Sequence, residues 1–450
     1  MSMLARWTRT WREDRVLRGV IRNSGYLLSS NTISMGLTSV QGILAALLLE
    51  PAAYGALGMV VLFASSVNRL LSFRMGEVVI KFAGQHLALG EKEKAAAVIK
   101  AALLAEALTS IVAYLILFVL APFAAQYIIK DPAAGRLIVF YGLALLANLV
   151  FETSTAVLQL AGKYRGQAAL NLAQSLLTAG WILGAYLLGG GLLDVLLAYL
   201  AGKLLYGVGM AALAYRRMPL VLGSGWWKSS FNQITNWRDI LYFAFTTNVS
   251  GTINMVIRDS EVLWVGFFLS TVEAGYYKFA LGIMNILVMP VSPLINTTFP
   301  EISRAVARRE WKPLRSILRK TSALSLVWTV GCAVGILLFG RWLLGLLKDG
   351  LYLPSYPAIL ILMVGYGFAN VFFWNRPLLL SFGLPNYPLK VTALVGAVKT
   401  ILMFFLVRPL GYLVQAALLS AYFLFSVGLI VLRGVAEIRK ASFSPQGEVE

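Results

Sequence analysis

Long apolar stretches recur along the whole chain, and they constrain its fold more than any other feature. Of the 450 residues, 59% are hydrophobic and 13% are charged, about half the charged fraction of a soluble domain. A helix crosses the bilayer's hydrocarbon core of about 30 Å with about 20 apolar residues. The stretches are too long for barrel strands. Lipid offers no hydrogen-bond partner to backbone N–H and C=O groups, so the segments must satisfy them internally as helices. We therefore expect an all-α integral membrane protein of about 12 transmembrane helices.

The apolar segments predict twelve membrane spans. They cover residues 25–48, 53–72, 101–120, 137–160, 166–189, 195–215, 240–268, 274–298, 321–340, 356–382, 391–407 and 411–432. Ahead of the first span lies a basic arm of six arginines: Arg6, Arg9, Arg12, Arg15, Arg18 and Arg22. The apolar run after them is too long and too polar for a signal peptide, so we expect a retained first helix.

The distribution of basic residues predicts the orientation. With both termini assigned to the cytoplasm, the inner segments hold 28 Lys and Arg residues and the outer loops hold five. This asymmetry follows the positive-inside rule. The net charge of +19 therefore reflects membrane orientation and not nucleic-acid binding. We interpret the two large cytoplasmic connectors, 73–100 and 299–320, as amphipathic helices at the membrane interface.

The two halves of the chain show a weak internal repeat at an offset near 220 residues. The segment from Leu49 to Gly55 aligns with the segment from Leu269 to Gly275, and Lys100 falls on Lys320. Six spans per half predict parallel repeats, an architecture of transporters with the substrate between the lobes. The expected domains are an N-terminal six-helix lobe, an inter-lobe connector, a C-terminal six-helix lobe and a cytoplasmic tail, at 1–215, 216–238, 239–432 and 433–450.

Polar residues form a stripe on the first helix of each half. In the second half the stripe has helical spacing and consists of Thr247, Ser250, Asn254, Arg258 and Glu261. In the first half it consists of Asn31, Ser34, Thr38 and Gln41. Two such faces predict a wet cavity between the lobes; the alternative is ordinary bonding between neighbouring helices.

Ten charged residues fall within the spans, where each costs at least ~2.5–3.5 kcal/mol at the bilayer centre. The bases are Arg69, Lys203, Arg258, Lys278, Arg376 and Lys399, and the acids are Glu106, Glu152, Asp259 and Glu261.

Several of these charges have alternative interpretations. Lys203, Arg376 and Lys399 have no acid within a helical turn, so they are candidates for binding a substrate phosphate. Arg258 and Glu261 are candidates for the cavity or for an internal ion pair, and Lys278 for the cavity or for reaching to the outer interface.

The four acids are candidates for ion or proton coupling, because a desolvated carboxylate titrates nearer to neutrality. The alternative for Glu106 and Glu152 is a pair with a cation on another helix.

The sequence gives no indication of a catalytic site, cofactor or metal. The single Cys332 excludes a disulfide within the chain, and the single His86 excludes a multi-histidine metal site. No nucleotide-binding motif is present, and the short outer loops leave no room for an aqueous catalytic domain.

A series of short motifs in a specific order gives the chain a family resemblance. They are Leu49 to Gly55, Arg74-Met75-Gly76-Glu77, Phe151-Glu152 before Gly162-Lys163-Tyr164-Arg165, Arg258-Asp259 with Gly266, Ala274-Gly275-Tyr276-Tyr277, Phe299 to Arg304, Tyr352 to Pro357 and Leu378 to Gly383. In these motifs the chain resembles the polysaccharide-transporter, O-antigen-flippase-like branch of the multidrug/oligosaccharidyl-lipid/polysaccharide (MOP) exporter superfamily.

This resemblance implies a non-enzymatic flippase with two lobes that alternate between inward-open and outward-open states. The implied cargo is a polyprenyl-diphosphate-linked oligosaccharide, moved across a bacterial or archaeal cytoplasmic membrane. Candidate partners are a polysaccharide polymerase and glycosyltransferases. A cation-coupled multidrug exporter of the same fold and a membrane-embedded glycan-modifying enzyme are the alternative functions.

Overall fold

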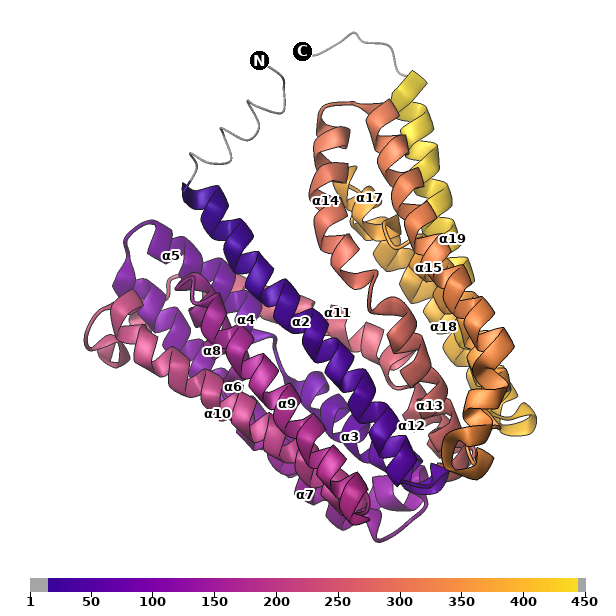
Figure 1. Cartoon of the computed structure of the whole chain (residues 1–450). Coiled ribbons are helices and arrows are strands. Elements are labelled where there is room, and N and C mark those ends of the chain that lie inside the picture. The colour runs from indigo at the N-terminus through magenta and orange to yellow at the C-terminus, as the bar shows by residue number, and fades with distance from the viewer. Residues whose placement is uncertain (1–14, 444–450) are drawn as a thin grey trace. The chain divides into compact units, whose positions relative to one another are not determined.

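The computed structural model describes residues 15–443, and every regular element in that range is a helix (Figure 1). Arg6, Arg9 and Arg12 of the basic arm and the last seven residues of the predicted tail lie outside the described residues. Within residues 15–443, eleven helices are long and apolar enough to cross a membrane, and the bent pair Thr271–Val288 and Ser292–Ala307 would supply a twelfth. The predicted all-α membrane fold with about twelve spans is confirmed.

The first half of the chain runs to the end of α10. Its elements are α2 (Arg15–Leu48), α3 (Pro51–Leu71), α4 (Met75–Val78), η1 (Val79–Ala83), α5 (Gly84–Ala88), α6 (Lys92–Phe123), η2 (Ala124–Ile129), α7 (Ala134–Ala147), α8 (Phe151–Leu160), α9 (Tyr164–Leu188) and α10 (Leu192–Leu222). Two short 3₁₀ turns, η3 (Trp226–Lys228) and η4 (Phe231–Gln233), lead to the second half.

The second half begins with α11. Its elements are α11 (Trp237–Asn254), η5 (Met255–Asp259), α12 (Glu261–Phe268), α13 (Thr271–Val288), α14 (Ser292–Ala307), α15 (Trp311–Leu346), η6 (Leu347–Gly350), α16 (Ser355–Val371), α17 (Asn375–Ser381), α18 (Asn386–Leu410) and α19 (Tyr412–Phe443).

The backbone supports the internal repeat. The fourth span of each half is broken, between α7 and α8 and again between α16 and α17. Left-handed residues that end helices also recur near the offset of 220 residues: Gly90 with Arg309, and Gly162 with Gly383. Because these conformations fix where the chain reverses, the two halves turn at equivalent places.

Each of the two large connectors packs an apolar face against protein, and the expected position of these helices at the membrane interface remains a prediction. Residues 75–88 form the helical run α4–η1–α5, and α6 begins at Lys92 after a turn at Gly90. One apolar face of this connector is buried in a protein core, with Val79 and Ile99 at 0% exposure. Residues 299–320 behave alike, since Ile302 and Leu314 are also fully buried. Intramolecular packing therefore accounts for these apolar faces.

The chain divides into two compact units. Unit 1 comprises Met1–Leu44, Val60–Gln126 and Asp131–Thr252, and unit 2 comprises Ala45–Met59, Tyr127–Lys130 and Ile253–Glu450. The helices α2 and α3 thus contribute residues to both units, while the lobe boundaries expected from the sequence remain predictions.

A close helix contact in unit 2 joins the first turns of α3 and α13. A Cβ atom on Gly55 would lie 2.0 Å from the carbonyl oxygen of Thr271, and one on Gly275 would lie 1.9 Å from that of Pro51. Only a residue without a side chain permits this approach. The two glycines are the equivalent residues of the predicted repeat.

Candidate functional site

The seventh span is interrupted by a π-helical turn, and this turn organises the site in unit 2. The span consists of α11, η5 and α12, and the amide of Ser260 donates to the carbonyl of Met255, five residues back, at 3.0 Å. A π turn adds a residue to the helical repeat, so side chains before and after it do not share one face.

The polar stripe predicted from Thr247 to Glu261 is therefore wrong as a single face. The side chain of Arg258 is 52% exposed, whereas that of Glu261 is 1% exposed. Asn254 is also exposed, and Thr247 donates to the carbonyl of Phe243 in its own helix at 3.0 Å. The side chain of Ser250 lies outside the described residues.

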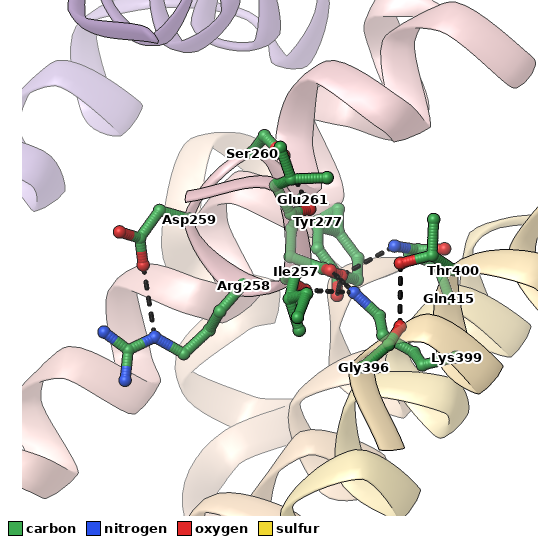
Figure 2. Close-up of polar contacts among 11 residues, drawn as sticks. Ile257, Arg258, Asp259, Ser260, Glu261, Tyr277, Gly396, Lys399, Thr400 and Gln415 are labelled. Carbon is green, nitrogen blue, oxygen red and sulfur yellow. Dashed lines mark hydrogen bonds and ion pairs between the residues drawn. The ribbon is translucent and has the colours of Figure 1, made fainter. Parts of the chain in front are cut away.

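Glu261 lies at the centre of a buried polar network (Figure 2). Lys399 of α18 donates to Oε1 of Glu261 and, at 2.6 Å, to the carbonyl of Ile257. Oε2 of Glu261 accepts from the hydroxyl of Tyr277 and from Nε2 of Gln415, each at 2.7 Å. The network thus ties α12 to α13, α18 and α19.

The charges pair differently from the sequence-based expectations. Lys399, expected to be an unpaired cation, forms an ion pair with Glu261. The ion pair considered as one alternative for Arg258 and Glu261 does not form; Nε of Arg258 instead donates to Oδ1 of Asp259 at 3.1 Å. Figure 2 shows Arg258 and Asp259 to one side of the Glu261 network. The π turn separates the two groups, so the one-turn spacing in sequence does not bring them together.

The Glu261–Lys399 pair is enclosed and leaves little access for a ligand. Both side chains are at most 3% exposed, and two buried opposite charges are tolerated only when each is compensated. Glu261 is also in the first turn of α12, where the helix dipole favours a negative charge. Lys399 is therefore unsuited to bind a substrate phosphate while this pair is intact.

The remaining predicted cations fall into two groups. Lys278 is held by Tyr54: its Nζ lies 3.8 Å from the ring centroid and donates to the Tyr54 carbonyl at 3.0 Å. Lys203 and Arg376 are exposed and have no hydrogen-bond or ion-pair partner in the described part of the chain. Along with the half-exposed Arg258, these two remain available to an anionic ligand.

A second buried acid lies in unit 1, at the break of the fourth span. Oε1 of Glu106 accepts from the amide of Glu152 at 2.7 Å, and Oε2 accepts from the amide of Thr153 at 2.9 Å. These amides belong to the first turn of α8, whose free N–H groups need acceptors. Glu106 is 4% exposed and caps the helix, which differs from the pairing with a distant cation considered from the sequence. The coupling roles of Glu106, Glu152, Asp259 and Glu261 remain predictions.

We predict that Glu106→Gln lowers the free energy of unfolding by about 1–3 kcal/mol, because the amide leaves one of two buried N–H groups unsatisfied. Thermal unfolding of the purified protein in detergent measures the effect. Glu93→Gln is the matched control, since Glu93 is exposed on the same helix, and its change should stay below about 1 kcal/mol. Equal melting of the two variants would contradict the capping role.

The polar stripe of the first half bonds to a neighbouring helix. Asn171 of α9 donates to Oδ1 of Asn31 at 3.0 Å, and Gln41 donates to the carbonyl of Ser175 at 3.0 Å. Ser34 donates to the carbonyl of Asn171 at 3.4 Å. These contacts match the helix–helix alternative, and the cavity role of Asn31 and Gln41 remains a prediction.

Two members of the Glu261 network were not predicted from the sequence. The sequence could have indicated Gln415, because it is a lone amide in an apolar span. The structure shows that it is fully buried. Tyr277 belongs to a motif quoted for the family resemblance, yet nothing in its spacing indicated Glu261 as its partner. Within residues 15–443, no group of three or more His, Cys, Asp or Glu side chains is placed to hold a metal ion.

Comparisons with known proteins agree with this fold. The chain is 23% identical over 356 residues to the inner membrane protein YghQ of Escherichia coli (strain K12), covering 78% of this chain and 98% of the relative. Its fold resembles the lipid II flippase MurJ in an inward closed conformation, with a TM-score of 0.67, 14% identity and coverage of 92% and 90% of the two chains.

It also resembles an inward-facing multidrug-resistance MATE transporter of the MOP superfamily, with a TM-score of 0.64, 14% identity and coverage of 91% and 95%. The family described as "Polysaccharide biosynthesis protein" matches residues 20–306, well over half of the chain. The chain therefore belongs to the polysaccharide biosynthesis protein family.

Proposed function

We propose that the protein is a flippase that moves a polyprenyl-diphosphate-linked oligosaccharide from the inner to the outer leaflet of the cytoplasmic membrane by alternating access. The observation that carries this proposal is the family match over residues 20–306, and the fold shared with a lipid II flippase supports it. The 28 to five distribution of basic residues supports a cytoplasmic location of both termini. In this proposal the chain is not an enzyme, since no bond of the cargo is broken.

The diphosphate of such a cargo needs cationic groups with unused hydrogen-bond donors. Arg258 meets this requirement although it pairs with Asp259, because its side chain is half-exposed and only its Nε donates to Asp259 among its described contacts. A guanidinium has five N–H donors in a fork that matches phosphate oxygens, so four remain. Lys203 and Arg376 are the further candidates.

The buried acid of unit 2 argues against a cationic drug as cargo. A cation-binding site requires a carboxylate whose charge is free, and Glu261 is already paired with Lys399. The similarity to a multidrug MATE transporter concerns the fold alone. Lys203 and Arg376 are exposed cations without an ion-pair partner in the described part of the chain, and these favour an anionic cargo.

We predict that Arg258→Gln slows translocation of lipid-linked oligosaccharide about tenfold to a hundredfold, because a charge-assisted hydrogen bond contributes about 1.5–3 kcal/mol. Proteoliposomes that report the outward appearance of a labelled lipid-linked glycan provide the measurement. Arg341→Gln, at an exposed arginine of α15, is the matched control. Unchanged transport by Arg258→Gln would remove Arg258 from the site, and transport of ethidium with none of the glycan lipid would favour drug export.

A further inference from the structure

A cavity of about 520 Å³ lies wholly within unit 1. One wall comes from the helical run η1–α5, and the other comes from residues 234–247, which lead into α11 and form its first turns. Its volume falls in the range of small-molecule sites, about 300–1,000 Å³. The cavity is separate from the Glu261 network, which belongs to unit 2.

The lining combines aromatic rings with unpaired polar groups. Phe82, Tyr242 and Phe243 supply the rings. Gln85, Asn236 and Asp239 also line the cavity. All three residues are exposed, and their side chains have no hydrogen-bond or ion-pair partner among residues 15–443. Their donors and acceptors are therefore accessible to a small polar molecule beside the aromatic surface.

The formal charges of the lining nearly cancel. Lys81 lies with its Nζ 4.1 Å from the ring centroid of Phe243, and Asp239 supplies the opposite charge. His86, the other basic group, lies 2.7 Å from a carboxylate oxygen of Glu91. The hydrogen bonds from Lys94 and then from His86 lower the pKa of Glu91 below its ordinary value, so this acid stays ionised beside the imidazole.

This charge balance decides between classes of ligand. A phosphate would require an excess of free cations, and a cationic drug would require an excess of free carboxylates. A neutral sugar requires neither. Its hydroxyl groups both donate and accept hydrogen bonds, and amide and carboxylate side chains can supply the partners. Its apolar ring face packs on aromatic side chains.

The cavity also lies in the part of the chain predicted to face the cytoplasm. Its residues come from the connector 73–100, which carries five basic residues, and from the region around the connector 216–238, which carries four. In the predicted orientation, a cargo assembled on the cytoplasmic side would meet this cavity before translocation.

We propose that this cavity binds a neutral sugar of the cargo glycan, through Gln85, Asn236 and Asp239 and the neighbouring aromatic rings. The proposal rests on the proposed flippase function and adds a sugar subsite to it. The sugar would bind on unit 1, apart from the cation proposed for the diphosphate.

Saturation-transfer NMR on the full-length protein in detergent micelles tests the proposal. The probes are free glucose, galactose, rhamnose and N-acetylglucosamine, with inorganic diphosphate as the charged comparison. We expect at least one neutral sugar to bind, and Asn236→Ala and Asp239→Ala to weaken that binding at least fivefold. Asn232→Ala is the matched control, because Asn232 is an exposed amide four residues earlier in the chain and outside the cavity lining.

Three results would overturn the sugar site: no sugar bound by the wild-type protein, equal binding by Asn236→Ala and the wild type, or binding of diphosphate alone. Melting curves of the variants ensure that any loss is measured on folded protein. The proteoliposome assay separates the two proposals. Sugar binding sensitive to Asn236→Ala without transport of the lipid-linked glycan would contradict the flippase function alone, whereas transport without such binding would contradict the sugar site alone.

Discussion

Replacing Lys399 with methionine is expected to lower the free energy of unfolding by about 3–5 kcal/mol, among the largest effects of any single change in the chain. The substitution would leave the carboxylate of Glu261 buried without its counter-ion, and an uncompensated buried charge carries this cost. Tyr277 and Gln415 would still donate to Oε2. Oε1 would lose the ammonium that is its described partner.

The double variant Glu261→Gln with Lys399→Met is expected to recover most of that loss, because the charge and its counter-ion are removed together. Lys390→Met is the matched control, since Lys390 is an exposed lysine in the first turns of the same helix. Its effect should stay within about 0.5 kcal/mol. Thermal unfolding in detergent measures all three variants. Equal melting of Lys399→Met and Lys390→Met would show that the ion pair does not stabilise the fold.

The spans were predictable because each depends on local composition. A run of about 20 apolar residues must be helical in lipid, and every predicted span coincides with a helix, including the bent pair at Thr271–Val288 and Ser292–Ala307. The two connectors show the limit of this reasoning. An amphipathic sequence shows that one face is apolar, but the sequence alone does not say whether lipid or protein covers it. The burial of Val79 and Ile302 shows that protein covers it here.

The pairing of buried charges was beyond reach of the sequence. Lys399 and Glu261 are 138 residues apart, so their contact depends on how α12 and α18 pack and not on helical spacing. The π turn also changed which residues share a helix face. A stripe drawn with the α-helical period runs through Arg258 to Glu261, but the extra residue in η5 turns the two side chains apart. The sequence thus identified Glu261 and Lys399 as charges within the spans but did not indicate that they pair.

The internal repeat was predictable in outline from the sequence. The tight contact between Gly55 and Gly275 joins equivalent residues of that repeat. The aligned segments ending at Gly55 and Gly275 both open the second span of their half, and the structure brings their first turns together. Each glycine faces backbone atoms of the other segment. The contact is therefore reciprocal, as expected for equivalent residues of a two-fold repeat.

Gly275→Ala is expected to destabilise the fold by about 3 kcal/mol or more, at the upper end of overpacking effects. Its Cβ would lie 1.9 Å from a backbone oxygen of Pro51, and backbone cannot yield as a flexible side chain does. Gly55→Ala should act alike, since its Cβ would lie 2.0 Å from the Thr271 oxygen. The double variant should cost less than the sum of the two, because one substitution already separates the turns and neighbouring changes are not additive.

Gly282→Ala is the matched control for this contact, since Gly282 lies on α13 and a Cβ there would meet no atom within 4 Å. Alanine in place of glycine inside a helix stabilises by up to about 1 kcal/mol, so Gly282→Ala and Gly275→Ala should shift the melting temperature in opposite directions. A shift of the same sign and size in both would mean that the two first turns do not touch. Additive losses in the Gly55→Ala and Gly275→Ala double variant would mean that the glycines act at independent sites, and the reciprocal contact between the repeats would then be wrong.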